Sequence, residues 1–123
     1  MEKMAAVVTL GVVLLWGASL TRASAHAFPE RSRPRVGATV TKAPHEVRIW
    51  FDAGLEPLFC TLRVKDTQGQ WVNKGKGHVK PGTHDRLLET RVPVLPPGKY
   101  HVYWSVIAVD GHHTEGHYPF RVR

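Results

Sequence analysis

Residues that can bind a metal ion stand at two widely separated places in this sequence, and one of them is the segment 110–116, DGHHTEG. The glycines of this segment predict a tight loop between two strands. Asp110 and His112 are two residues apart, so in extended backbone their side chains point to the same side. A carboxylate and an imidazole placed together in this way supply half of the ligands of a metal site.

The other place is His26, which becomes the first residue if the chain is cut after Ala25. Its α-amine and its ring Nδ1 can then close a chelate ring on one ion. Both groups bind metals only when deprotonated, and their ordinary pKa values of about 8 and about 6.5 allow this near neutral pH. Together with Asp110 and His112 they would supply three nitrogens and one oxygen, a set that suits Cu(II).

Other candidate ligands leave alternatives open. His113 could replace His112, lie beside the site or face the solvent, and we favour His112 because adjacent residues of extended backbone point to opposite faces. Cys60 alternates with Leu62 and Val64, so we expect a buried thiol in the core rather than a ligand. The remaining histidines lack ligand spacing and are interpreted as surface residues, with a second, weaker metal site as the alternative: His45, His78, His84, His101 and His117.

The first 25 residues have the features of a cleaved secretory signal peptide. Lys3 stands before an uncharged apolar run, 5–20, and the small-residue sequence Ala-Ser-Ala follows at 23–25. The run is short for a helix that must cross a bilayer core of about 30 Å, so a membrane anchor is the weaker interpretation. We expect a signal peptide at 1–25 and a soluble, periplasmic domain at 26–123 that does not span the membrane.

Cleavage changes the composition of the working protein. The precursor of 123 residues has 17 Lys and Arg, 10 Asp and Glu and a net charge of +7, whereas residues 26–123 keep 15 and 9, a net charge of +6, and no Met. An excess of basic over acidic residues suggests a polyanion, such as nucleic acid or an anionic membrane, as a partner. Export and the lack of interleaved aromatic and basic residues lead us to expect no nucleic-acid partner. Without methionine the mature chain lacks the thioethers that Cu(I) prefers.

Alternating apolar residues predict an all-β fold, since no segment after residue 25 keeps a helical period. The expected strands are 46–51, 60–66, a short one that begins with 70–72, 87–92, 99–109 and 118–122. Strand 99–109 is expected to be central because both of its faces are largely apolar. The basic segment 31–35 is expected to be a loop. Short strands and regular turns in about 100 residues favour a single antiparallel sandwich or small barrel.

Taken in order, these motifs resemble the CopC family of periplasmic copper-resistance proteins. The matching residues are His26-Ala27-Phe28, Ser32, Pro34 and Gly37-Ala38; Ala43-Pro44 with 47–51; the run 95–104, LPPGKYHVYW; and Ala108-Val109-Asp110-Gly111-His112 with Gly116 and Phe120. The resemblance covers essentially all of residues 26–123. The combination of a mature N-terminal His with an Asp-Gly-His loop is specific, whereas a Pro-Pro-Gly turn alone is not.

The resemblance implies a seven-stranded Greek-key β-sandwich, called cupredoxin-like or immunoglobulin-like. It implies Cu(II) bound by His26, through its amine and ring, and by Asp110 and His112. It also implies a role in copper resistance, in which the protein sequesters copper or passes it to a CopD-type inner-membrane transporter. Two positions depart from the family: Ala53 stands where many members have an acidic residue, with Asp52 one place earlier, and His113 follows the loop.

An enzyme is the rival hypothesis. No Ser, Cys or paired carboxylate stands at a spacing typical of nucleophilic or acid–base catalysis. We therefore expect that the protein is not an enzyme. An N-terminal His chelate with a second His nevertheless resembles the histidine brace of copper monooxygenases that act on extracellular substrates. Asp110 as a ligand would occupy a position that oxygen activation needs open. An exposed Trp50 or Trp71 near the metal would favour this rival.

Overall fold

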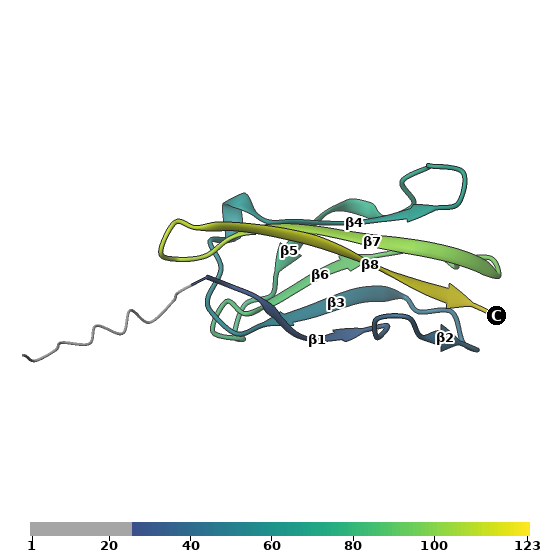
Figure 1. The fold of residues 1–123 in the computed structure, drawn as a ribbon, viewed down its shortest axis with the longest axis horizontal. Coiled ribbons are helices and arrows are strands. Elements are labelled where there is room, and N and C mark those ends of the chain that lie inside the picture. Colours follow the sequence, from purple (N-terminus) through teal and green to yellow (C-terminus); the bar gives the residue numbers. More distant parts are fainter. Residues whose placement is uncertain (1–25) are drawn as a thin grey trace, which may run out of the picture.

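Two four-stranded β-sheets pack face to face in the computed structural model, which describes residues 26–123 (Figure 1). The predicted signal peptide, 1–25, lies outside the described residues. The first sheet has the order β1 (Pro29–Arg33), β3 (Glu46–Phe51), β6 (Leu87–Arg91) and β5 (Lys74–Val79). The second has the order β2 (Thr39–Val40), β8 (His113–Val122), β7 (Gly98–Ile107) and β4 (Thr61–Asp66). A 3-10 turn, η1 (Pro57–Phe59), precedes β4.

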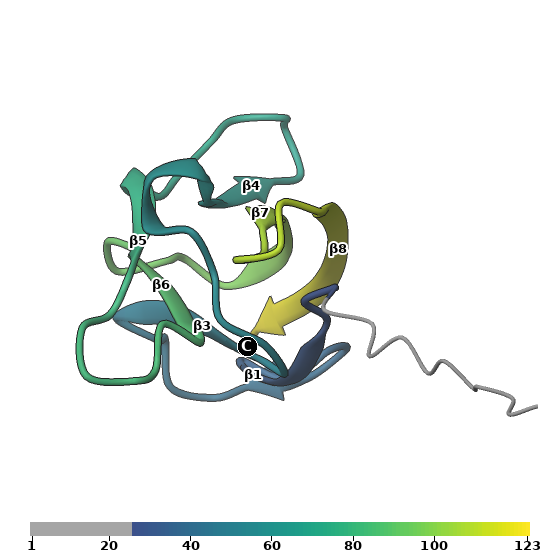
Figure 2. The same ribbon diagram turned by 90° about the vertical axis from the view of Figure 1, so that its left-hand side faces the viewer.

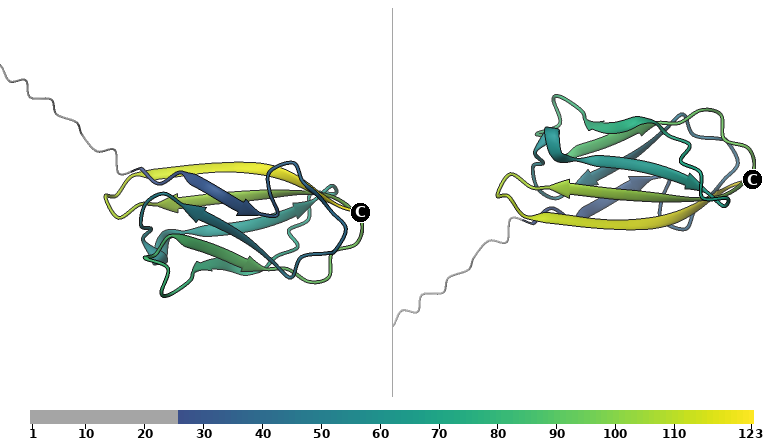
Figure 3. Two further views of the ribbon diagram at one scale, coloured as in Figure 1. Left: turned by 90° about the horizontal axis from the view of Figure 1, so that it is seen from below. Right: turned by 90° about the horizontal axis from the view of Figure 1, so that it is seen from above.

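The all-β sandwich expected from the sequence is confirmed. Every strand pair is antiparallel except the short parallel pair of β2 with β8. Seven strands have five or more residues, and the two-residue β2 is the eighth. Figure 3 shows the first sheet from below, with β1, β3 and β6 in front, and the second from above, with β4, β7 and β8 in front.

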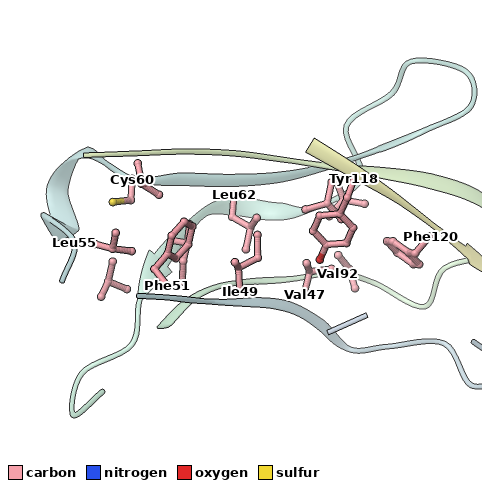
Figure 4. Packing of buried hydrophobic residues seen from close by; sticks show 14 of the residues in the cluster. Val47, Ile49, Phe51, Leu55, Cys60, Leu62, Val92, Tyr118 and Phe120 are labelled. Atoms are coloured by element: carbon pink, nitrogen blue, oxygen red, sulfur yellow. The ribbon is translucent and has the colours of Figure 1, made fainter. Parts of the chain in front are cut away.

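The core lies between the two sheets and consists of the inward residues of the alternating strands (Figure 4). In β3 the burial alternates residue by residue, with Val47, Ile49 and Phe51 inward. Leu62 and Val64 of β4 face them across the sandwich, fully buried. Because each strand has one apolar face, the period of two decides which side chains point inward and which face the solvent.

The hairpin of β7 and β8 is the longest pairing and positions the predicted metal loop. β7 lies between β8 and β4, so the predicted central strand is confirmed. The pairing ends at Ile107 opposite His113, and a tight turn joins the two strands. In this turn the Gly111 N–H donates to the Ala108 carbonyl (2.8 Å), and Gly111 has a φ of 91°, which favours glycine.

Two sequence expectations about this fold are wrong. Residues 31–33 of the expected basic loop belong to β1, an edge strand whose arginines face the solvent while Ser32 is buried. The expected strand at 70–72 makes only an isolated bridge between Trp71 and Lys65, and β5 begins at Lys74 instead. β5 escaped prediction because its sequence, KGKGHV, has glycines where an apolar face would show; a Cβ at Gly77 would lie 3.0 Å from Leu62 Cβ.

Four segments meet at one end of the sandwich, here called the metal-loop end: residues 26–28, 52–60, 80–86 and 108–112. Backbone hydrogen bonds connect them, from Asp52 N–H to Phe28 O (2.9 Å), from Leu55 N–H to Asp85 O (2.8 Å) and from Val109 N–H to Gly54 O (3.1 Å). Figure 2 looks onto this end. None of the helical turns between residues 26 and 123 is long and apolar enough to cross a membrane.

Candidate metal centre

The structure brings His26 and His112 together at the metal-loop end. Their ring centroids lie 4.4 Å apart with the ring planes at 68°. The two residues are 86 positions apart in the sequence, so this proximity is a product of the fold. Both rings remain accessible, since His26 is partly buried and His112 is exposed.

Asp110 is joined to His112 by two hydrogen bonds. Its Oδ1 accepts the His112 backbone N–H (3.0 Å), and its Oδ2 lies 2.6 Å from His112 Nδ1. The backbone hydrogen bond, reinforced by the one to the ring, lowers the pKa of the Asp110 carboxyl. The expectation that these two side chains share one side of the loop therefore agrees with their geometry, and the carboxylate is ionised at neutral pH.

The N-terminal arm, residues 26–28, is held in place by two side chains that the sequence did not single out as functional. Asp52 Oδ1 accepts the Phe28 N–H (2.8 Å), and the Thr114 hydroxyl donates to the Ala27 carbonyl (2.7 Å). Ala27 itself is fully buried. These contacts anchor the backbone on both sides of the arm, and so direct His26 toward His112.

Asp52 and Thr114 could not be recognised from sequence spacing. Asp52 is 24 residues from Phe28, and Thr114 is 87 residues from Ala27. The only signal was the family comparison at position 53, where Ala53 replaces an acidic residue and Asp52 precedes it. In the structure the displaced carboxylate binds the backbone of the arm.

His113 lies on the other side of β8 from the arm. Its Nε2 is hydrogen-bonded to the Ser105 hydroxyl (2.8 Å) and lies 4.0 Å from Glu115 Oε2. The next residue, Thr114, faces Ala27, as the alternation of a strand requires. This orientation separates His113 from the His26–His112 pair.

Cys60 is fully buried, and the predicted packing role fits its surroundings. Its thiol donates to the Glu56 carbonyl (3.2 Å), and the side chain lies in the core beside Leu55 (Figure 4). Burial raises the pKa of the Cys60 thiol, so it stays protonated at neutral pH. A buried, protonated thiol is a poor metal ligand.

Of the remaining histidines, His101 and His117 come together on the outer face of the second sheet, with ring centroids 5.2 Å apart. Burial, followed by the neighbouring His117, Lys99 and Lys65, lowers the pKa of His101. Lys65 and Arg63 also lie over the ring of Trp71, at 4.4 and 3.7 Å. This clustering of positive charge disfavours a second cation site there.

His26, Asp110 and His112 are potential ligands, but their side chains are not arranged as a complete metal-binding site. Among residues 26–123, no three side chains of His, Cys, Asp and Glu are grouped as ligands of one ion. Binding of one ion by these residues would need two changes. The Asp110–His112 hydrogen bond must open before both groups bind a metal, and the nitrogen of His26 is part of a peptide bond in the precursor, where its lone pair is delocalised into the carbonyl. Removal of residues 1–25 would convert it into an amine.

Comparison with known families identifies residues 29–123 as a match to the model of the CopC domain. Protein YobA of Escherichia coli K12 is 31% identical over 99 residues, which cover 80% of each chain. The copper transport protein CutJ of Bacillus subtilis is 29% identical over 112 residues, which cover 90% of this chain but 21% of CutJ.

Solved structures show the same fold. CopC from Methylosinus trichosporium OB3b superposes with a TM-score of 0.69 at 31% identity, covering 79% of this chain and 93% of that one. PcoC, a methionine-rich copper resistance protein from Escherichia coli, superposes with a TM-score of 0.68 at 26% identity, covering 80% and 100%. The relatives named for copper resistance and copper transport connect this chain to copper.

Proposed function

Because this chain belongs to the CopC family, we propose that it is a Cu(II)-binding protein of copper resistance and homeostasis. It sequesters the ion or passes it to a membrane transporter of the CopD type. The observation that carries the proposal is the meeting of His26 with His112, which is itself hydrogen-bonded to Asp110, at one exposed end of the sandwich.

The proposed ligands are the His26 amine, the His26 ring, the His112 ring and the Asp110 carboxylate. Loading exchanges the hydrogen bond between Asp110 and His112 for two bonds to the metal. Because Asp110 is already ionised, no proton has to leave the carboxylate itself. The protein makes and breaks no covalent bond in its cargo; its mechanism is the exchange of one set of ligands for another.

The ligand chemistry favours the oxidised ion. Imidazole, amine and carboxylate suit Cu(II), whereas Cu(I) is bound best by thiolates and thioethers. Residues 26–123 contain no methionine, and their one thiol, Cys60, is buried. In this respect the chain differs from PcoC, which is described as methionine-rich.

The proposed compartment is the periplasm, reached through cleavage of 1–25, and the proposed partner is a membrane copper transporter. CutJ supports this pairing, because the segment that resembles this chain is about a fifth of that copper transport protein. A domain of this kind therefore works there beside a longer stretch of chain.

Carrier function is favoured over a copper monooxygenase. The rival needs an exposed aromatic ring near the metal on which a sugar can stack. Arg31 lies over the half-buried ring of Trp50, at 4.1 Å. Trp71 is 41% exposed, but it pairs with Lys65 towards the far end of β4, away from the metal-loop end. Incubation of the copper-loaded protein with a polysaccharide and a reductant should give no oxidised sugars; their reproducible formation would overturn the carrier proposal.

A direct test compares the mature protein, residues 26–123, with a variant carrying one extra glycine before His26. The extra residue turns the His26 nitrogen back into an amide and leaves every side chain in place. We expect Cu(II) affinity, measured by competition with a chelator, to fall by more than about a hundredfold. Paramagnetic resonance should show three nitrogen ligands in the mature protein and fewer in the variant. Equal affinity of the two forms would exclude the amine as a ligand.

A further inference from the structure

Exposed apolar side chains gather at the metal-loop end. Phe28 is 49% exposed, Leu58 79%, Phe59 59% and Val109 59%. The other large apolar side chains that are exposed between residues 26 and 123 lie elsewhere: Val36, Trp71 and Val94. Solvent-exposed apolar groups that cluster rather than scatter are typical of surfaces that bind another protein.

Two of these side chains adjoin the proposed copper ligands, and the other two lie on η1 at the same end of the sandwich. Phe28 lies next to His26, with ring centroids 6.1 Å apart, and Val109 directly precedes Asp110. Leu58 and Phe59 belong to η1, which is tied to the end of β7 by the hydrogen bond from Glu56 N–H to Ile107 O (2.8 Å). In Figure 2, η1, the start of β1 and the β7–β8 turn all face the viewer.

The charge of this end is opposite to that of the rest of the molecule. The segments 26–28, 52–60, 80–86 and 108–112 carry two basic residues, Lys80 and Arg86, and four acidic ones: Asp52, Glu56, Asp85 and Asp110. The net charge of these side chains is −2. The α-amine that cleavage would create at His26 brings it to −1 while the amine is protonated, and Cu(II) bound to the deprotonated amine would bring it to 0. Residues 26–123 as a whole carry 15 basic and 9 acidic residues, so the remainder has 13 and 5, a net charge of +8.

We propose that the metal-loop end is the docking surface for the protein that receives or supplies copper, and that this partner presents an apolar contact face flanked by positive charge. The inference deepens the proposed function and depends on it for the partner's role. Direct transfer of copper requires the partner's donor atoms to reach the ion. The partner must therefore contact the metal-loop end during transfer. The four apolar side chains supply contact area, and the acidic residues supply complementarity to a basic face.

The charge distribution also fixes orientation. A basic partner is repelled by the +8 remainder of the domain, whereas the metal-loop end is weakly negative without copper and uncharged with it. Such complementarity acts mainly on the rate and direction of encounter rather than on the final affinity. Transfer needs a short-lived complex with one orientation, and this charge pattern provides it.

The test uses copper-free mature protein and two synthetic peptides. One is a short amphipathic peptide of leucine and lysine, and the other has glutamate in place of lysine. In amide chemical-shift mapping, the lysine peptide should shift Phe28, Leu58, Phe59 and Val109 although both molecules are basic. The surface is excluded if those amides do not move, if the Trp71 and Tyr103 region moves instead, or if the glutamate peptide moves them equally.

Val94 offers a matched control for Leu58, because both side chains are 79% exposed and Val94 lies between β6 and β7 at the opposite end. Leu58→Ser should weaken peptide binding by about fivefold or more, as expected for a side chain in a contact centre. Val94→Ser should leave it unchanged; equal effects of the two variants would overturn the proposal.

Cu(II) affinity of both serine variants should equal that of the unaltered protein. Because the peptide experiment contains no copper, a failure of copper binding would overturn the proposed function and leave the docking surface standing. If the peptide fails to bind although copper affinity is normal, the docking surface is overturned and the proposed function stands.

Discussion

The carboxylate of Asp52 holds the backbone of Phe28 through a closed pair of hydrogen bonds. Asp52 Oδ1 accepts the Phe28 N–H at 2.8 Å, and the Asp52 N–H donates to the Phe28 carbonyl at 2.9 Å. This pair fixes the arm two residues after His26. A flexible arm would lose conformational entropy each time it bound an ion, whereas a fixed arm has already lost it.

We therefore predict that Asp52→Ala weakens Cu(II) binding by about tenfold or more, the usual effect of removing a group that orients a metal ligand. Chelator competition measures the affinity. Electron paramagnetic resonance spectra of the variant saturated with Cu(II) should still show the same ligand atoms, because Asp52 does not itself bind the ion.

Asp66 is the matched control, because its Oδ1 also accepts backbone N–H groups, those of Gln68 and Gln70, both at 2.9 Å. It lies at the far end of β4. Both alanine variants should lose about 1 to 2 kcal/mol of unfolding free energy, as expected for lost hydrogen bonds to a carboxylate. Only Asp52→Ala should lose copper affinity. A loss in Asp66→Ala of the same size would mean that general destabilisation, not arm position, is responsible.

The two adjacent histidines of the loop should differ in their effect on copper. His112→Ala should weaken Cu(II) binding by more than about a hundredfold, since losing a ligand costs more than losing an orienting group. His113→Ala should change the affinity by less than about threefold, because its ring is hydrogen-bonded to Ser105 on the opposite face of β8. Chelator competition measures the Cu(II) affinity of both variants. A larger loss in His113→Ala than in His112→Ala would identify His113 as the ligand.

Gly116 leaves room for the indole of Trp104. A Cβ at Gly116 would lie 2.6 Å from Trp104 Cζ2, closer than any real contact. Gly116→Ala should therefore lower the unfolding free energy by about 1 to 3 kcal/mol, measured by denaturant titration. Gly54→Ala is the control, because its added Cβ would meet Val109 Cγ1 at 3.4 Å, an ordinary distance. Combining Gly116→Ala with Trp104→Leu should cost less than the sum of the two single changes.

Tyr118 makes stability depend on alkaline pH. Its side chain is buried, and burial raises its pKa from 10.0 to about 12. The neutral phenol is thus favoured in the folded state, so its contribution is complete below pH 10 and is lost as the pH rises from 10 toward 12. The loss amounts to about 2 to 3 kcal/mol for a shift of this size.

Tyr118→Phe tests this assignment, because phenylalanine keeps the ring and removes the ionisable group. The buried hydroxyl makes no hydrogen bond of normal geometry within residues 26–123, and only a weak interaction with Ser32 lowers its pKa, so the substitution should cost little stability at pH 7. Unfolding free energies measured from pH 9 to 12 should fall less steeply in the variant. An unchanged slope would assign the alkaline loss to other groups, such as Cys60 or Tyr100, whose pKa values are also raised by burial.

The strands that sequence reasoning found have at least one continuous apolar face, and both faces of the central strand 99–109 are largely apolar. The alternation at Val47, Ile49 and Phe51 predicted β3 because the core selects every second residue of a strand. β1 and β5 were missed for the opposite reason. β1 and β5 are the edge strands of the first sheet and are rich in arginine, lysine and glycine. These residues allow backbone pairing but form no apolar face, so the sequence of these strands shows no alternation of apolar and polar residues.

The sequence by itself determined the chemistry: which side chains can bind copper, that methionine is absent after residue 25, and that Asp110 and His112 share a loop. Only the tertiary structure decided that His26 lies against His112, that His113 points away, and that Asp52 and Thr114 hold the arm. The physical reason is that side-chain type and local alternation act over a few residues. The distance between His26 and His112 depends instead on how two sheets stack and on hydrogen bonds that span 24 and 87 positions of the chain.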